Sequence, residues 1–267
     1  MTARIAPAPK QISRRVQLRL GMAQLAFRGL AEDWWLKHLG DVHWQLIADS
    51  VGQNTTLFKD RAGRQTYAAF CATEFDQPHP DHAGLGGTLD VTSTLWSAGR
   101  SRLQSIHILK SGDITVARFR LMSTFVCHEK DGVNASISRS MPYLIPVLDP
   151  APDDFAARTG TAARACRTQG HDLRDHVLIQ PCIGTDFNAV GLLYFPSFTR
   201  FFDQTERGLV RSTGWSPLRR RRVLYFNNIE HGDDVIGASC ADGLELWCAG
   251  GRAAEPRKLA HCAFDRF

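Results

Sequence analysis

The sequence predicts an α+β protein in which the order of one helix followed by a run of strands occurs twice. Three observations support this: a helical pattern over residues 31–52 that gives way to strands, a composition shift over residues 146–175, and a second strand–helix–strand order after it. The halves share no close sequence identity, so the repeat is one of architecture. We expect a flexible leader at 1–15, domains at 16–145 and 176–267, and a linker at 146–175.

The first predicted helix has its apolar residues three and four positions apart, which places them on one face. They are Trp35, Leu36, Leu39, Val42, Leu46 and Ile47. Glu32 and Asp33 fall in the first turn, where the helix dipole favours acidic residues. Gly40 weakens the middle of the helix by about 1 kcal/mol, which would allow a kink there.

Strand patterns follow this helix. Residues 60–63 predict a hairpin turn, and residues 63–75 then carry aromatic and apolar side chains with the spacing of a strand. Residues 89–109 and 113–129 continue as long strands, with a turn at Ser111-Gly112-Asp113.

The linker is rich in Pro, Ala, Thr, Asp and Arg, and it has room for one short helix over 153–166. The second half then predicts a strand, a turn and a helix, and further strands, over 176–184, 186–210, 219–240, 244–250 and 257–267. Proline is tolerated only in the first turn of a helix. We therefore expect the regular helix to begin near Pro196, with residues 191–195 as an irregular lead-in.

Composition sets limits on function. The formal net charge of +5 does not indicate nucleic acid, but it suits an acidic partner or a phosphate-bearing ligand. The seven cysteines form no Cys-x-x-Cys pair, so we expect reduced, mostly buried thiols of a cytoplasmic protein. The N-terminus lacks the apolar stretch of a secretory signal, and no apolar run approaches the length of a membrane helix.

The most specific motif is the turn that contains Asp186, Asn188 and Gly191. It is similar to the Asp-x-Asn-x-x-Gly-like turn that opens onto the central helix of hot-dog thioesterases. Together with residues 29–44 and 63–70, it makes the chain from about residue 20 to 267 resemble the double hot-dog proteins typified by the bifunctional acyltransferase/decarboxylase of leinamycin polyketide biosynthesis. The resemblance implies two curved antiparallel sheets, each wrapped around a long central helix.

The resemblance also implies decarboxylation of a malonyl- or methylmalonyl-type thioester and transfer of the acyl group to an acyl carrier protein. Its implicated tyrosine corresponds to Tyr67. The substrate would be a coenzyme A or phosphopantetheine thioester, with no metal and no other cofactor. The partners would be acyl-CoA and the carrier protein, and the chain itself would be a monomer or a homodimer.

Decarboxylation produces an enolate, so the site must present hydrogen-bond donors to the thioester oxygen. We expect Asp186 and Asn188 beside Tyr67 in catalysis, with a helix N-terminus supplying backbone N–H groups. Gly191 would let the backbone approach the substrate, and Leu192, Arg100 and Arg220 would also contact it. Tyrosine is a weak nucleophile at neutral pH, and the candidates to assist it are Arg100, Arg102 and His43.

Structural interpretations remain open beside these. Tyr67 suits an ordinary strand, and Asp186 and Asn188 suit an Asx turn that caps a helix. The arginine run 219–222 is consistent with a solvated strand edge or with a grip on phosphates or an acidic carrier. A hot-dog acyl-CoA or acyl-carrier-protein thioesterase is the alternative function, and a non-catalytic carrier-binding module is the second alternative. Ser-hydrolase, zinc-protease and phosphate-loop motifs are absent.

Overall fold

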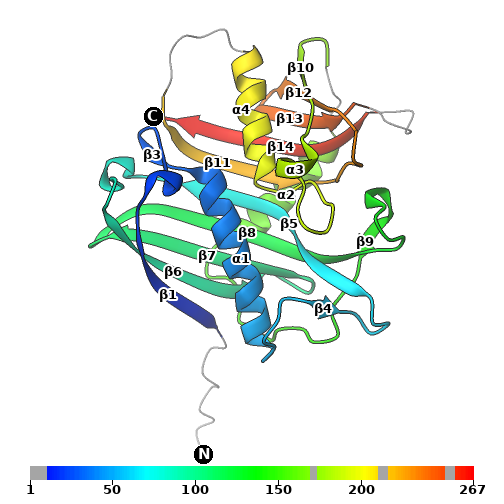
Figure 1. Ribbon diagram of the computed structural model, residues 1–267, viewed down its shortest axis with the longest axis horizontal. Coiled ribbons are helices and arrows are strands. Elements are labelled where there is room, and N and C mark those ends of the chain that lie inside the picture. The colour runs from blue at the N-terminus through cyan, green and yellow to red at the C-terminus, as the bar shows by residue number, and fades with distance from the viewer. Residues whose placement is uncertain (1–10, 169–172, 210–215, 250–255) are drawn as a thin grey trace, which may run out of the picture.

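The computed structural model describes residues 11–168, 173–209, 216–249 and 256–267, and their dominant feature is one twelve-stranded antiparallel sheet. The main path of the sheet has the strand order β1-β6-β7-β8-β5-β11-β14-β13-β12-β10, while β4 pairs with β5 and β9 with β8. Helices α1 and α4 cover one face and α2 lies on the other (Figure 1). No helix among the described residues is both long and apolar enough to cross a membrane.

The first half of the sheet wraps around α1, which spans Glu32–Ser50. Its strands are β1 (Ile12–Arg19), β5 (Gln65–Asp76), β6 (Thr88–Ser97), β7 (Arg102–Ser111) and β8 (Ile114–His128). All six apolar residues that predicted the helix are buried, which confirms that face. The helix runs through Gly40 without a break. A Cβ atom there would lie 3.0 Å from Cζ of Phe195, so the glycine makes room for this ring.

The second half repeats this connectivity around α4 (Ser197–Leu209). Its strands are β10 (His176–Ile179), β11 (Leu218–Tyr225), β12 (Val235–Cys240), β13 (Gly243–Cys248) and β14 (Arg257–Arg266). In each half the strand before the helix lies at the outer edge, and the strand after it lies at the junction between the halves. The predicted repeat of architecture is therefore confirmed.

Short elements complete the described chain. They are η1 (Met22–Gln24), β2 (Leu25–Ala26), β3 (Gly29–Leu30), β4 (Phe58–Lys59), η2 (Pro80–His82), η3 (Asn134–Ser136), β9 (Ile137–Arg139), α2 (Phe155–Thr168) and α3 (Ile183–Asp186). None of the seven cysteines is paired, and four are buried, as expected.

One predicted boundary needs correction. Residues 12–15 belong to β1, because Ile12–Arg19 pairs with β6 along its whole length, and the rest of the expected leader, up to residue 10, lies outside the described residues. The short helix expected within the linker is present as α2, and its Phe155 and Cys166 are buried against the sheet. The segment before Pro196 is irregular and α4 starts at Ser197, as predicted from the proline. Leu192 and its neighbours therefore precede the helix and are not part of it.

The arginine run lies at the junction of the two halves, on β11, so it is not a strand edge. The side chain of Arg221 is 3 % exposed, and its guanidinium donates to Glu32 of α1 at 2.8 Å and to Asp203 of α4. Arg219 and Arg220 both face Asp76 instead, and Arg220 is exposed. Arg219 and Arg220 therefore do not alternate, and Arg221 is the inward residue that ties both central helices to the junction strand.

A chain of buried hydrogen bonds crosses the core of the first half. His43 is hydrogen-bonded to Ser105 at 2.7 Å and to Ser123 at 2.8 Å. Ser105 is bonded in turn to His107 at 2.7 Å, and His107 to Ser93 at 2.8 Å. Burial lowers the pKa of His43 to about 3 and holds that of His107 well below its ordinary value. Both rings are therefore neutral in the folded protein at neutral pH.

These histidines predict a loss of stability in mild acid. Their folded-state pKa values lie below the ordinary value of 6.5, so the unfolded chain binds more protons as pH falls. As the pH is lowered below about 6.5, the free energy of unfolding should decrease by roughly 1.4 kcal/mol per pH unit for each histidine. In urea unfolding from pH 7 to 5, a His43→Gln variant should show a shallower decline than the wild type.

A His79→Gln variant is the matched control, because His79 is exposed. Its pH dependence should equal that of the wild type. If the free energies of unfolding of the wild type and His43→Gln declined in parallel with pH, that would contradict a neutral, buried His43.

Candidate active site

A cavity of about 740 Å³ lies where the two junction strands separate. β5 and β11 pair from Asp76/Arg220 to Ala72/Leu224, and no pairing follows. Beyond that point β5 residues 67–71 line one wall of the cavity and residues 225–228 line the other. Lining residues come from α1 on one face of the sheet and from α2 on the other. The cavity therefore passes through the gap between the strands.

The α1 side of the cavity is mainly aromatic and apolar. The rings of Phe70 of β5 and Phe195 are in contact, tilted by 45° with centroids 4.2 Å apart, and the ring of Phe198 of α4 lies edge-on to that of Tyr225 of β11 at 5.2 Å. Leu192, 8 % exposed, lies on the same lining. A compartment of this kind suits an acyl chain, because burial of each methylene contributes about 0.8 kcal/mol.

The loop before α4 is fixed by Asp186, which is 2 % exposed. Both of its carboxylate oxygens accept from Arg200 of α4 at 2.6 Å, and one accepts from the Cys182 backbone at 2.7 Å. Its carbonyl accepts from the Tyr194 amide at 2.7 Å. Asp186 is not part of the cavity lining. In the structure its carboxylate is occupied in holding the loop on α4.

Asn188 lines the cavity, and its side chain combines an oxygen that holds a turn with an NH₂ donor. Its Oδ1 accepts from the backbone N–H groups of Val190 at 3.1 Å and Leu192 at 3.0 Å, which is an Asx turn. These bonds fix the carboxamide, and its NH₂ group has no protein partner within the described part of the chain. Gly191 takes a φ of +76° at the end of this turn, a conformation that favours glycine.

Two asparagines that the sequence did not single out clamp this loop. Nδ2 of Asn134, a buried residue after β8, donates to the carbonyls of Gly191 at 2.8 Å and Ile229 at 2.7 Å. Oδ1 of Asn228, after β11, accepts from the Leu193 amide at 2.9 Å. Both line the cavity. Both are far from residues 186–195 in the sequence, so local patterns carried no signal for them.

Tyr67 lies in β5 on the cavity wall, as a candidate catalytic residue should. Its ring meets His128 edge-on with centroids 5.9 Å apart. Partial burial raises its pKa, and Asp131 and Cys127 add to the effect, so the phenol is neutral at physiological pH. A neutral phenol donates a hydrogen bond well but is a poor nucleophile.

The expected helpers of Tyr67 lie in three different places. Arg102 lines the cavity with it. His43 is bonded to Ser105 and Ser123 within the core and is absent from the lining. Arg100 is exposed at the turn between β6 and β7, and neither it nor Arg220 reaches the cavity lining. Of the residues expected to bind substrate, Leu192 alone is on the lining, with Gly191 directly beside it.

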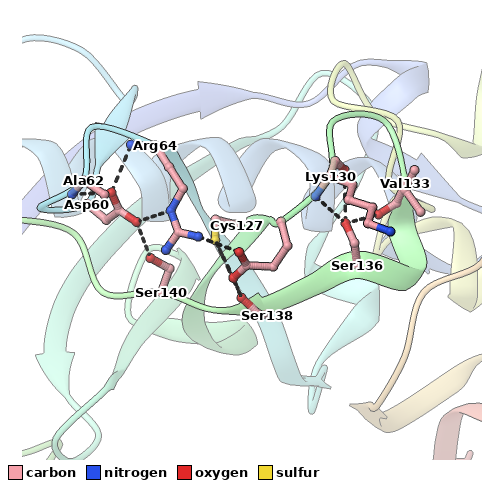
Figure 2. Close-up of polar contacts among 10 residues, drawn as sticks. Asp60, Ala62, Arg64, Cys127, Lys130, Val133, Ser136, Ser138 and Ser140 are labelled. Carbon is pink, nitrogen blue, oxygen red and sulfur yellow. Dashed lines mark hydrogen bonds and ion pairs between the residues drawn. The ribbon is translucent and has the colours of Figure 1, made fainter.

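The wall that carries Tyr67 is supported by a polar network (Figure 2). Asp60 accepts from the Arg64 side chain at 2.8 Å and from Ser140 at 2.9 Å. Arg64 also donates to Glu129 at 2.6 Å, and Glu129 accepts from Ser138. The network joins the β4–β5 turn to the β8–β9 hairpin. Residues 137–139 of that hairpin thereby keep their place on the cavity lining.

Asp41 of α1 is the one carboxylate among the described residues that line the cavity. Partial burial raises its pKa, an effect that neighbouring His38 opposes. Burial and the Asp41 charge together raise the pKa of Tyr194 to about 12. Burial also raises the pKa of the Cys71 thiol to about 11, which makes it unreactive as a nucleophile. The side chain best suited to accept a proton in the cavity is therefore Asp41.

Outside the cavity, Cys240, Asp242 and His261 place three potential metal-ligand atoms within 4.8 Å of one another. His261 Nε2 and Asp242 Oδ1 are already 3.0 Å apart as a hydrogen-bonded pair.

The Asx turn predicts a contrast between two substitutions at Asn188. Asn188→Ala removes the acceptor of two backbone N–H groups and should lower the free energy of unfolding by about 1–3 kcal/mol. Asn188→Asp keeps an acceptor oxygen in the same position and should stay within about 0.5 kcal/mol of the wild type. Urea unfolding at neutral pH measures both, and equal destabilisation by the two variants would contradict the turn.

No protein-family model matches the chain, and no curated protein matches it. Solved structures do. The 12:0-ACP thioesterase from Umbellularia californica is similar with a TM-score of 0.64 and 10 % identity, over 96 % of this chain and 98 % of that one. An acyl-ACP thioesterase from Bacteroides thetaiotaomicron is similar with a TM-score of 0.61 and 10 % identity, over 95 % and 98 % of the two chains. At this identity the likeness concerns the fold alone: the chain has the hot-dog fold of acyl-ACP thioesterases.

Proposed function

We propose that this chain is a double hot-dog enzyme that hydrolyses an acyl thioester carried by coenzyme A or by an acyl carrier protein. The observation that carries the proposal is the cavity at the junction. It joins an apolar compartment to the carboxylate of Asp41 and to the side-chain NH₂ donor of Asn188. The acyl-ACP thioesterases with which the chain shares its fold over nearly its whole length support the same reaction class.

In the proposed reaction, Asp41 accepts a proton from a water molecule as the water oxygen attacks the thioester carbonyl. The carbon–oxygen bond forms, and the carbonyl oxygen becomes an oxyanion that the Asn188 NH₂ group stabilises as a donor. The carbon–sulfur bond then breaks, and the thiolate leaves and takes the proton from Asp41. The products are a free acid and a thiol.

The hydrolysis mechanism predicts a specific effect of Asp41→Asn. Asp41 makes no ion pair within the described residues, so the substitution should leave the melting temperature unchanged. Loss of the base should reduce kcat by about 10²–10⁴-fold. The measurement is thiol release from a panel of acyl-CoA and acyl-carrier substrates without any acceptor. Asp49→Asn, on the same helix and outside the cavity, is the matched control, and equal activity of the Asp41 variant and the wild type would exclude Asp41 as the base.

A second candidate is decarboxylation of a malonyl-type thioester with transfer to an acyl carrier protein. The position of Tyr67 on the cavity wall favours it, because a neutral phenol can donate to the thioester oxygen as the enolate forms. This reaction loses CO₂ from the substrate, and the resulting enolate takes a proton from water at its α-carbon. The carrier thiol then attacks the thioester carbonyl, and the original thiol leaves with the carrier thiol's proton. It requires no general base on the α1 side.

Tyr67→Phe separates the two candidates. If decarboxylation operates, the variant should lose about 10²–10³-fold in CO₂ release from methylmalonyl-CoA, and mass spectrometry should find the carrier unloaded. If hydrolysis operates, thiol release by Tyr67→Phe should stay within a few-fold of the wild type. No CO₂ release and no carrier loading by the wild type would exclude the second candidate.

A further inference from the structure

The charges around the cavity are distributed unevenly. Five of the described arginines line it, and we term them the arginine rim: Arg102, Arg139, Arg164, Arg167 and Arg257. Among the described lining residues Asp41 is the single carboxylate, and it belongs to α1. Among the described residues, no carboxylate lies within ion-pair distance of any rim arginine. Their positive charge is therefore not neutralised within the described chain.

Strand register places Arg102 and Arg139 on the α2 face of the sheet. Arg102 is opposite Thr124 of β8, and Arg139 is opposite Val126, two residues further along. Phe125 between them packs into the core on the α1 side. Because side chains alternate along a strand, residues 124 and 126 and their partners face α2. Tyr67, opposite Val126 on the other side of β8, shares that face.

Helix α2 adds two more arginines on this side of the cavity, which forms its α2-side opening. Arg164 and Arg167 are exposed and line the cavity together with Gly160 and Ala163. The guanidinium of Arg167 lies 5.3 Å from the ring centroid of Phe226, an aromatic residue just after β11. The small side chains of α2 beside these arginines leave room at the mouth, and the long basic ones border it.

Arg257, at the start of β14, adds a buried donor that has no partner among the described residues. One of its terminal nitrogens donates to the Asn228 carbonyl at 3.1 Å. Its Nε is buried and makes no hydrogen bond within the described part of the chain. A buried N–H group without a partner costs free energy, and it is a site at which an oxygen acceptor would be stabilised.

We propose that the arginine rim is the subsite for the phosphate of a phosphopantetheine arm, so that the thioester substrate enters from the α2 side and passes its acyl chain through the gap between β5 and β11. This assignment rests on the proposed function, because it orients the same substrate in the same cavity. Guanidinium groups bind phosphate through paired hydrogen bonds. The uncharged arm would lie beside Tyr67, and the acyl chain would reach the compartment of Phe70, Phe195 and Phe198.

Isothermal titration tests the subsite without any turnover. The probes are pantetheine, 4′-phosphopantetheine and coenzyme A. We expect wild-type protein to bind 4′-phosphopantetheine at least 10-fold more tightly than pantetheine. The double variant R102Q/R139Q should lose this preference, while R61Q/R207Q, a control pair of exposed arginines away from the cavity, should keep it. Thermal unfolding of both variants confirms that they fold.

The two sources of the phosphate are distinguished by the third probe. Equal affinity for coenzyme A and 4′-phosphopantetheine assigns the subsite to the arm of a carrier protein. A further gain of 10-fold or more with coenzyme A assigns it to the nucleotide-bearing substrate. Either result supports the phosphate subsite.

Two results would overturn the proposal. One is equal affinity of the wild type for pantetheine and its phosphate. The other is a phosphate preference that persists in R102Q/R139Q when that variant is folded. Failure of the proposed function gives a different result, since phosphate-dependent binding would remain while neither hydrolysis nor decarboxylation occurred.

Discussion

The pairing of β5 with β11 is the constraint on which the rest of the structure depends. It joins two half-sheets at strands that would otherwise be edges, and edges with free N–H and C=O groups are prone to association. The pairing covers five residue pairs and stops at Ala72/Leu224. Next to that point the β5–β8 register shifts between Phe70 and Ala72, so β5 turns away from β11. The same pairing that closes the sheet thus creates the opening through it.

The sequence predicted most of this architecture, because periodicity and turn residues are local signals. The α1 face, the start of α4 after Pro196, the short helix in the linker and the succession of a helix and strands in both halves could be read from short segments. The boundary at residues 12–15 was less accurate, and the sequence did not predict that the linker helix packs on the sheet. Whether β1 pairs with β6 and whether α2 packs on the sheet depend on residues that lie far away in the chain.

The candidate site could be predicted only in part, for the same reason. Asn188 and Tyr67 carried motif signals, and both line the cavity. Asn134, Asn228 and the arginine rim lie in ordinary sequence contexts, and only the register of β7, β8 and β9 brings Arg102 and Arg139 together. Arg219–Arg222 gave the strongest charge signal, yet Arg221 serves an ion-pair network that links α1, β11 and α4. Charge density along the chain did not indicate where charge would gather in space.

The opposite end of the junction differs from the end with the cavity. There the side chain of Gln77, which is 2 % exposed, accepts from the Leu30 backbone N–H at 3.3 Å and donates to the Leu218 carbonyl at 2.5 Å. The backbone N–H of Gln77 donates to the Arg219 carbonyl at 3.0 Å. The strand order relates the two ends by an approximate twofold rotation, so a symmetric homodimer of half-chains would carry the same residues at both. Covalent fusion of the halves removes that requirement. At one end of the junction Gln77 can stabilise the contact between the halves, while the residues at the other end can change to form the cavity. The fold is therefore approximately symmetric, but the two ends of the junction differ in function.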